Sequence, residues 1–444
     1  MVKHKVVLMI AMLAAGTCLA AEPADQARVK RGEPQRQGNY WEERAECSAP
    51  LREGGRLVVR ADFGSVKVKP GANDRMDCHV RLRAYTANEA EARRFFREYE
   101  LSIRQLENGV LLKGTLTQGR PSSRSLGAEF DIAAPVRLSL DVETKGGDVG
   151  VQKLDGELQA VTAGGDVSVG DVTGPARVET AGGDIRLATV GTRLEARTAG
   201  GSIRVGDVKG DATLETSGGE IVAGMVGGTL RGETAGGDLV LRGASGPIEA
   251  RTAGGQIQIG ESGGSIVAQT AGGSIRLQGA RGKVEARTAG GSIDLLQLRN
   301  AVRAATAAGC IMAQIDADQK TFAASELQTS MGDIQVFLPP NLPLTIDAAI
   351  DIAGGHKIVS DFPINIQRDG PVFAATKVRG EGALNGGGEV LRIRTSAGNI
   401  EIRKLDPNTL AQLRARQESY WKRWQEQEDR RQQKEQDQRE RQKE

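Results

Sequence analysis

Threonines and small polar residues recur in this chain at a spacing that could place them in chemically uniform rows. Ten threonines follow one another at intervals of eighteen residues, without insertion: Thr144, Thr162, Thr180, Thr198, Thr216, Thr234, Thr252, Thr270, Thr288 and Thr306. Most precede a glycine pair, and the residue four after each threonine is often acidic: Asp148, Asp166, Asp184, Ser202, Glu220, Asp238, Gln256, Ser274, Ser292 and Cys310. Stacked carboxylates could hold a cation or act as an acid pair, and outward threonines could form a binding ladder.

The mixture of side chains in these rows favours a structural role instead. A repeated calcium site would not accept serine, glutamine and cysteine in place of aspartate. We interpret Thr-Ala-Gly-Gly as a structural unit, with threonine hydroxyls bonding the turn backbone beside a narrow core. The glycines are expected to supply backbone angles that strain other residues. Neighbours such as Asp166 and Asp184 are interpreted as a turn feature rather than a catalytic pair.

An enzyme that acts on polysaccharide is the main catalytic alternative. Such a site needs clustered acids, bases or a metal, usually with aromatic platforms for the sugar rings. No Phe, Tyr or Trp occurs between Asp131 and Thr321, and His79 and His356 are far apart in sequence. The net charge of +2 predicts no basic patch for nucleic acid. We therefore expect a protein without catalytic residues, metal or cofactor.

The cysteines indicate which compartment the chain occupies. Cys18 lies in an apolar leader, which leaves Cys47, Cys78 and Cys310 in the mature chain. In an oxidising compartment we expect a Cys47–Cys78 disulfide, since these residues flank the first strand-like segment. Cys310 would then be unpaired, as a tolerated substitution in a turn or as a reactive thiol.

The repeat itself predicts two short strands and two turns per unit. Apolar Leu194 and Ala196 precede Thr198 on alternate positions, and Ile203 and Val205 alternate again after the glycines. Period two indicates strands with one buried face, and an unbroken repeat indicates stacking units. Successive strands must pair in parallel, which predicts an all-β single-chain β-solenoid of ten coils, about 48 Å long. A left-handed hexapeptide helix does not fit, because glycines fall on its inward positions. A flattened right-handed coil is favoured.

The remaining chain divides into flanking segments. Residues 1–21 read as a secretory signal peptide, with lipidation of Cys18 as an alternative. Beyond it we expect a flexible leader at 22–46, an N-terminal cap at 47–139, the solenoid at 140–319, irregular coils at 320–405 and a charged helical tail at 406–444.

Both flanks carry recognisable fragments of structure. Residues 57–68 resemble a degenerate first coil, and residues 88–100 have helical spacing. Thr329 and Thr395 begin two further coils. Asp406 and Pro407 predict a helix start. Trp421 and Trp424 in this tail could dock on the solenoid or bind a partner.

The Thr-Ala-Gly-Gly-Asp-Ile units, the segment at 332–339 and the closing segment at 386–400 resemble a bacterial β-strand-repeat family known as "putative adhesin", a family of unknown function. The resemblance covers about residues 55–405 and implies a solenoid without catalytic residues to carry over. The charged tail lies outside the family pattern.

These observations together predict an exported, non-catalytic envelope protein of the periplasm or cell surface. The solenoid face would act as a rigid scaffold or bind a protein or matrix polymer. The alternative is an envelope-sensing accessory that binds its partner through the tail. Outward charges of opposite sign should lie side by side, as for Arg177 and Glu195, Glu179 and Arg197, and Glu285 and Arg303.

Overall fold

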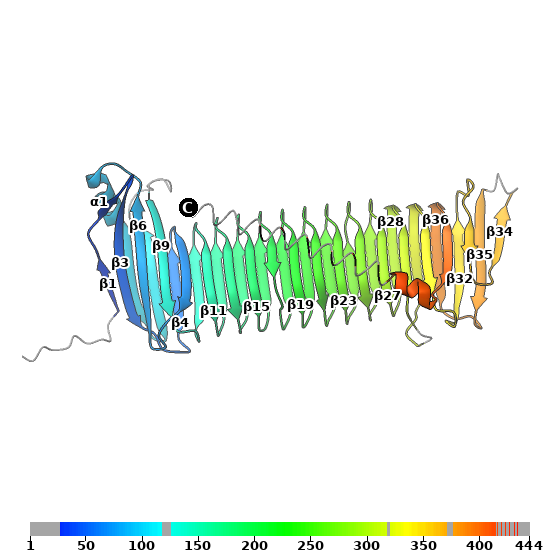
Figure 1. The fold of residues 1–444 in the computed structure, drawn as a ribbon, viewed down its shortest axis with the longest axis horizontal. Coiled ribbons are helices and arrows are strands. Elements are labelled where there is room, and N and C mark those ends of the chain that lie inside the picture. Colours follow the sequence, from blue (N-terminus) through cyan, green and yellow to red (C-terminus); the bar gives the residue numbers. More distant parts are fainter. Residues whose placement is uncertain are drawn as a thin grey trace, which may run out of the picture.

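The protein is a long, flattened rod of two stacked parallel β-sheets, with an antiparallel cap at each end (Figure 1). The computed structural model describes residues 27–117, 126–317, 320–370 and 376–413, and beyond these positions 415, 419, 422, 426, 430 and 433. The predicted signal peptide at 1–21 and both tryptophans of the tail lie outside the described residues. The all-β parallel solenoid predicted from the repeat is confirmed.

Each coil contributes one strand to each sheet. We call the first the threonine sheet, because most of its strands end at the repeated threonine. Its regular strands are β10 (Ser139–Thr144), β12 (Leu158–Thr162), β14 (Ala176–Thr180), β16 (Leu194–Thr198), β18 (Ala212–Thr216), β20 (Leu230–Thr234), β22 (Ile248–Thr252), β24 (Ile266–Gln269), β26 (Val284–Thr288) and β28 (Val302–Ala308).

We call the second the isoleucine sheet, because its strands begin at the apolar residue after the glycines. Its regular strands are β11 (Val149–Leu154), β13 (Val167–Val172), β15 (Ile185–Val190), β17 (Ile203–Val205), β19 (Ile221–Val226), β21 (Leu239–Ala244), β23 (Ile257–Ser262), β25 (Ile275–Ala280), β27 (Ile293–Leu298) and β29 (Ile311–Ile315).

A constant register joins the coils. Leu158 pairs with Ala176, and Thr162 pairs with Thr180, so each residue meets its own equivalent one repeat later. The same shift holds in the isoleucine sheet, where Ile185 pairs with Ile203. Because every coil meets an identical neighbour, one residue pattern stacks along the whole rod.

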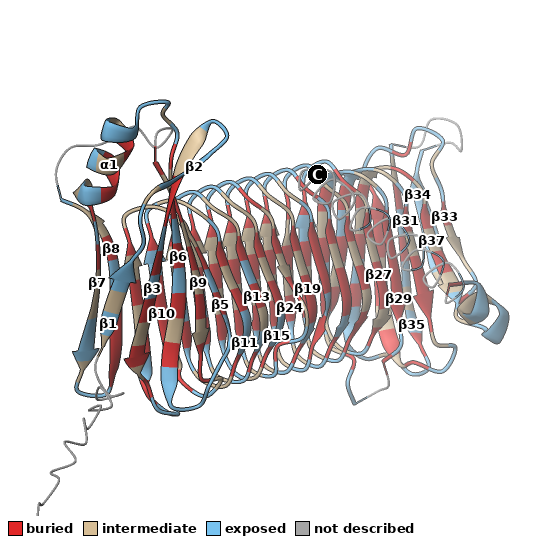
Figure 2. Cartoon of the chain, turned by 60° about the vertical axis from the view of Figure 1, so that its left-hand side comes forward, coloured by how far each residue is buried: buried red, intermediate tan, exposed pale blue. Residues whose placement is uncertain are grey.

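The core is the thin space between the sheets (Figure 2). Leu194, Ala196, Ile203 and Val205 point into it and are at most 5% exposed, as the alternation predicts. The threonine at the end of each strand is also buried.

The N-terminal cap contains a coil that is separated from the regular repeats in sequence but stacks directly on the first of them. β4 (Arg56–Ala61) and β5 (Ser65–Pro70) pair in parallel with β10 and β11, which confirms the degenerate first coil. Beyond them lie β6 (Arg75–Ala84), β7 (Tyr99–Leu106), β8 (Gly109–Leu116) and β9 (Leu126–Ala134). The predicted helix is α1 (Glu89–Glu98), where the Asn88 side chain accepts hydrogen bonds from two first-turn amides.

The expectation of a flexible leader at 22–46 is wrong for its described part. Residues 28–46 form β1 (Arg28–Arg31), β2 (Gln35–Gln37) and the start of β3 (Tyr40–Pro50). The buried side of β3 carries small residues and Glu43, and Glu42 on the opposite side is also buried; each glutamate is 6% exposed. Arginines neutralise both carboxylates, as in the Arg31–Glu43 ion pair. Because the buried glutamates here are stabilised by ion pairs with arginines, the segment lacks the alternation of apolar residues by which a buried strand is predicted.

The C-terminal cap is built out of sequence order. After β30 (Ser325–Met331) and β31 (Ile334–Leu338), the chain forms β32 (Leu344–Ile350), β33 (Ile358–Ser360), β34 (Asn365–Asp369) and β35 (Lys377–Leu384). It then returns, so that β36 (Val390–Ala397) pairs between β30 and β32, and β37 (Ile400–Lys404) pairs between β31 and β33. The predicted coils at Thr329 and Thr395 are therefore direct neighbours.

Candidate interaction surfaces

The threonine row is internal and ties one turn to the next. In each regular coil the threonine Oγ1 donates to a glycine carbonyl of the preceding coil, as from Thr198 to Gly183 at 2.9 Å. The same hydroxyl accepts from the amide of Gly201 at 3.2 Å. One side chain thus satisfies polar backbone groups of two turns beside the core. The structural interpretation of the threonine ladder is confirmed.

The second glycine of each pair is required for a different reason from the one the sequence suggested. A Cβ on Gly201 would lie 2.0 Å from the carbonyl oxygen of Gly183, which is the oxygen that Thr198 binds. Gly165 and Gly147 stand in the same relation, at 2.2 Å. Among the second glycines of the regular coils only Gly147 has a left-handed φ, of 121°. Close approach of neighbouring coils, rather than backbone strain, therefore selects glycine at most of these positions.

The aspartates that follow the glycines cap the next coil. Asp148 Oδ1 accepts from the backbone amide of Asp166 at 3.0 Å, and Asp166 Oδ1 accepts from that of Asp184 at 2.9 Å. Asp184 does the same for Ser202. Serine can replace aspartate in this role, because its hydroxyl also accepts an amide proton, as Ser274 does for Ser292. The carboxylate row is therefore a turn feature.

The outer face of the threonine sheet is a ladder of opposite charges. Arg177 and Glu195 are neighbours in register and form an ion pair at 3.4 Å. Arg197 contacts Glu195 at 2.9 Å and Glu215 at 3.0 Å. Glu179 faces Arg197, and Glu285 faces Arg303, as predicted.

A second run of the same ladder follows one coil later. Arg231 contacts Glu233 at 2.8 Å and Glu249 at 2.9 Å, and Arg251 pairs with both glutamates. These side chains are 30–40% exposed. We call the two runs, from Arg177 to Arg251, the charge ladder. It presents alternating charges at the coil spacing of about 4.8 Å.

Charged pairs also join the solenoid to its caps. Asp141 on β10 receives Nη2 hydrogen bonds from Arg56 at 2.9 Å and Arg60 at 2.7 Å, both on β4. Burial raises the pKa of Asp141, but these hydrogen bonds outweigh burial, so the pKa lies below its ordinary value of 3.8. At the other end, Arg394 on β36 lowers the pKa of Asp347 on β32 in the same way. Both clamps lie where strands distant in sequence meet.

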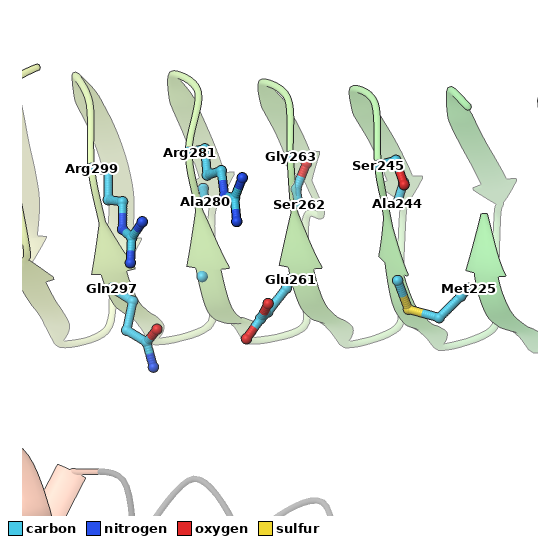
Figure 3. Close-up of a pocket in the computed structure, with 11 residues that line it drawn as sticks. Met225, Ala244, Ser245, Glu261, Ser262, Gly263, Ala280, Arg281, Gln297 and Arg299 are labelled. Carbon is cyan, nitrogen blue, oxygen red and sulfur yellow. The ribbon is translucent and has the colours of Figure 1, made fainter. Parts of the chain in front are cut away.

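A groove of about 320 Å³ runs along one edge of the isoleucine sheet, from β19 to β27 (Figure 3). It exists because Gly263, Gly279 and the small side chains of Ala244 and Ala280 line it. In Figure 3, one side carries Arg281 and Arg299 on neighbouring coils, and the other carries Met225, Glu261 and Gln297. The groove is polar and mixed in charge. Sequence reasoning missed it, because its glycines lie outside the repeated pair.

A small apolar patch lies outside the core, on the outer face of the isoleucine sheet. Leu296, Met312 and Phe337 point outward from β27, β29 and β31, yet each is at most 9% exposed. Leu413 packs on them from a helical segment that begins at 407. Asp406 caps this segment by accepting from the amide of Thr409 at 2.8 Å, as its sequence predicts.

The remaining predicted residues are dispersed. Cys47 and Cys78 face each other across β3 and β6 and form a disulfide, while Cys310 is free and exposed. His79 lies on β6 and His356 before β33, at opposite ends of the rod. Trp421 and Trp424 lie outside the described residues.

No group of three or more His, Cys, Asp and Glu side chains is placed to hold a metal ion in the described part of the chain. No described helix has the length and apolar character needed to cross a membrane.

No protein-family model and no curated protein matches this chain. Solved structures with similar features include a putative cell adhesion protein from Clostridium sporogenes, 9% identical, which covers 86% of this chain and 100% of its own, with a TM-score of 0.14. A putative adhesin from Bacteroides fragilis is 11% identical and covers 66% of this chain and 96% of its own, with a TM-score of 0.20.

Proposed function

We propose that the protein is an exported, adhesin-like binding module or rigid scaffold of the cell envelope, without catalytic activity of its own. The observation that supports this proposal is the charge ladder, which offers the same kind of contact at successive coils. Extended partners bind such surfaces through many weak contacts that add up when made together. A protein or a matrix polymer could supply the partner.

Export is part of this proposal. It is supported by the apolar leader at 1–21 and by the disulfide between Cys47 and Cys78, since disulfides persist in oxidising compartments. Mass spectrometry of exported protein should find a chain that begins near residue 21 and carries this disulfide. An intact Met1, or free thiols at both cysteines, would contradict export.

The binding test uses sedimentation with the insoluble cell-envelope fraction. Two ladder arginines, Arg197 and Arg231, are changed together to alanine, and the matched control changes Arg281 and Arg299 in the groove to alanine. We expect the ladder variant to lose most binding, the control to keep it, and wild-type binding to fall as salt increases, because exposed charges are screened. Equal binding by the ladder variant and the wild type would exclude this face.

The alternative function, envelope sensing through the tail and its Trp421 and Trp424, makes the opposite prediction. Deletion of 406–444 would then abolish capture of the partner, whereas a ladder-based module should keep binding without the tail. Turnover of a polysaccharide by the purified protein would overturn both functions.

A further inference from the structure

The start of the C-terminal helix is fixed to the outer face of the isoleucine sheet at two points. The amide of Leu405 donates to the carbonyl of Leu338 at 2.8 Å, which leads the chain out of β37. Seven residues into the helix, Leu413 is 7% exposed against Leu296, Met312 and Phe337. The helix therefore leaves its cap lying on the sheet rather than pointing into solvent.

The described positions beyond Leu413 show which side of the helix faces solvent. Six positions are helical and exposed: Ala415, Ser419, Lys422, Glu426, Arg430 and Gln433. Their spacing of three or four residues places them on one side of a helix. A helix that continues in this phase places Leu413, Tyr420 and Trp424, at spacings of seven and four, on the opposite side.

The isoleucine sheet offers a matching surface along its length. Val240 points outward from β21 but is only 5% exposed. The neighbouring strands β23 and β19 carry Gly260 and Gly224, which are buried and add no side chain to this face. Nearer the anchor, Gln314 points outward from β29 at 2% exposure, and its Nε2 has no hydrogen-bond partner among the described residues.

The helix could run along the sheet toward either end of the rod, and the length of its C-terminal segment decides between these two directions. A helix rises about 1.5 Å per residue, so residues 414–433 span about 30 Å. Coils are about 4.8 Å apart, so this length crosses about six of them. Beyond β31, toward the C-terminal cap, the described sheet has only β37 and β33 left, about 10 Å, which is too short for this helix. Toward the N-terminus the face continues over the Arg276–Asp294 ion pair of β25 and β27 to Val240 on β21.

We propose that the C-terminal segment 414–433 is the occupant of the outer face of the isoleucine sheet. It lies as a helical latch that runs from β29 toward β17, with Tyr420 and Trp424 against the sheet. Its charged side faces solvent, which agrees with the exposure of Lys422, Glu426 and Arg430. The latch covers one face of the rod and leaves the charge ladder on the other face free.

Hydrogen exchange of the full-length chain tests the latch. In the wild type we expect the amides of 414–433 to be protected, to the same degree at high and at tenfold lower protein concentration. Met312→Glu places a charge under Leu413 and should speed exchange in this segment roughly tenfold, while the solenoid amides stay unchanged. Trp424→Ala should also speed it.

The matched control is Val267→Glu, which adds the same type of charge to the outer face of the threonine sheet and should leave 414–433 protected. Unprotected amides at 414–433 in the wild type would overturn the latch. So would unchanged protection in both Met312→Glu and Trp424→Ala. Protection lost on dilution would instead assign the face to a second copy of the chain.

Discussion

At the scale of single residues, the repeat is maintained by contacts between equivalent positions on neighbouring coils. The hydroxyl of Thr198 donates to the carbonyl of Gly183 in the preceding coil. Gly201, in the same coil as Thr198, has no Cβ, which leaves space for that carbonyl. Because each coil repeats these contacts, a substitution in one coil affects two turns.

The two glycines of one turn should therefore differ in their tolerance of alanine. Gly165→Ala would put a Cβ 2.2 Å from Gly147, whereas a Cβ on Gly164 meets nothing within 4 Å. We expect Gly165→Ala to lower the free energy of unfolding by about 1–3 kcal/mol, the usual cost of overpacking. Gly164→Ala should change it by less than about 0.5 kcal/mol. Urea unfolding of both variants decides the matter, and equal midpoints would contradict the inter-coil contact.

The Asp141 clamp predicts how stability depends on pH. Its pKa is lowered in the folded state, so its stabilising effect is complete above the ordinary value of 3.8 and is lost as the pH falls through the lowered pKa. Asp141→Asn should cost about 1.5 kcal/mol near neutral pH, because Arg56 is half-exposed and solvent screens its contribution.

The measurement is the melting temperature between about pH 6 and about pH 2. Wild type and Asp141→Asn should converge toward the acid end. A constant difference between the two curves would show that the Asp141 carboxylate does not titrate at a lowered pKa.

At the scale of elements, successive residues of each solenoid strand alternate between the core and the outer surface. A residue in the core is therefore followed directly by one that faces solvent. β24 shows the contrast, because Ile266 is 1% exposed in the core and the next residue, Val267, points outward. The thin core leaves an inward charge no partner and no route to water.

Ile266→Asp should accordingly cost several kcal/mol, about 4 or more, whereas Val267→Asp should cost about 1 kcal/mol or less, from the like charges of Glu249 and Glu285 beside it. Circular dichroism and urea unfolding of the pair would measure the difference. Comparable losses from both substitutions would mean that the two positions do not lie on opposite faces of the sheet.

At the scale of the whole molecule, the rod is a stack whose length can change only in whole coils. Registers advance by one repeat from β10 to β28, so removing one complete repeat should bring equivalent residues together. The caps matter equally, since they pair the open strand edges that would otherwise promote aggregation.

Deletion of residues 195–212 should thus give a folded, soluble rod about 4.8 Å shorter. A deletion one residue shorter, of 196–212, turns the remaining side chains of that strand to the wrong face and should abolish folding. Small-angle X-ray scattering and thermal melting compare the two. Folding of both deletions alike would refute the fixed register.

The repeated sequence by itself determined the parallel solenoid, the two strands per coil, the inward threonines and the coils at Thr329 and Thr395. This was possible because each residue contacts its equivalent in the neighbouring coil, so the period of the sequence predicts the contacts. The start of the C-terminal helix was equally readable, since Asp406 and Pro407 act within one turn. The charge pairs of the threonine sheet followed from the same period.

Only the tertiary structure decided how the ends are closed. Contacts between segments distant in sequence make the return of β36 between β30 and β32, the Asp141 and Asp347 clamps, and the Arg83–Glu42 and Arg31–Glu43 ion pairs. The patch of Leu296, Met312 and Phe337 arises likewise from residues that are unremarkable in their own strands. Contacts between non-equivalent segments leave no period, so they emerge only when the chain is folded.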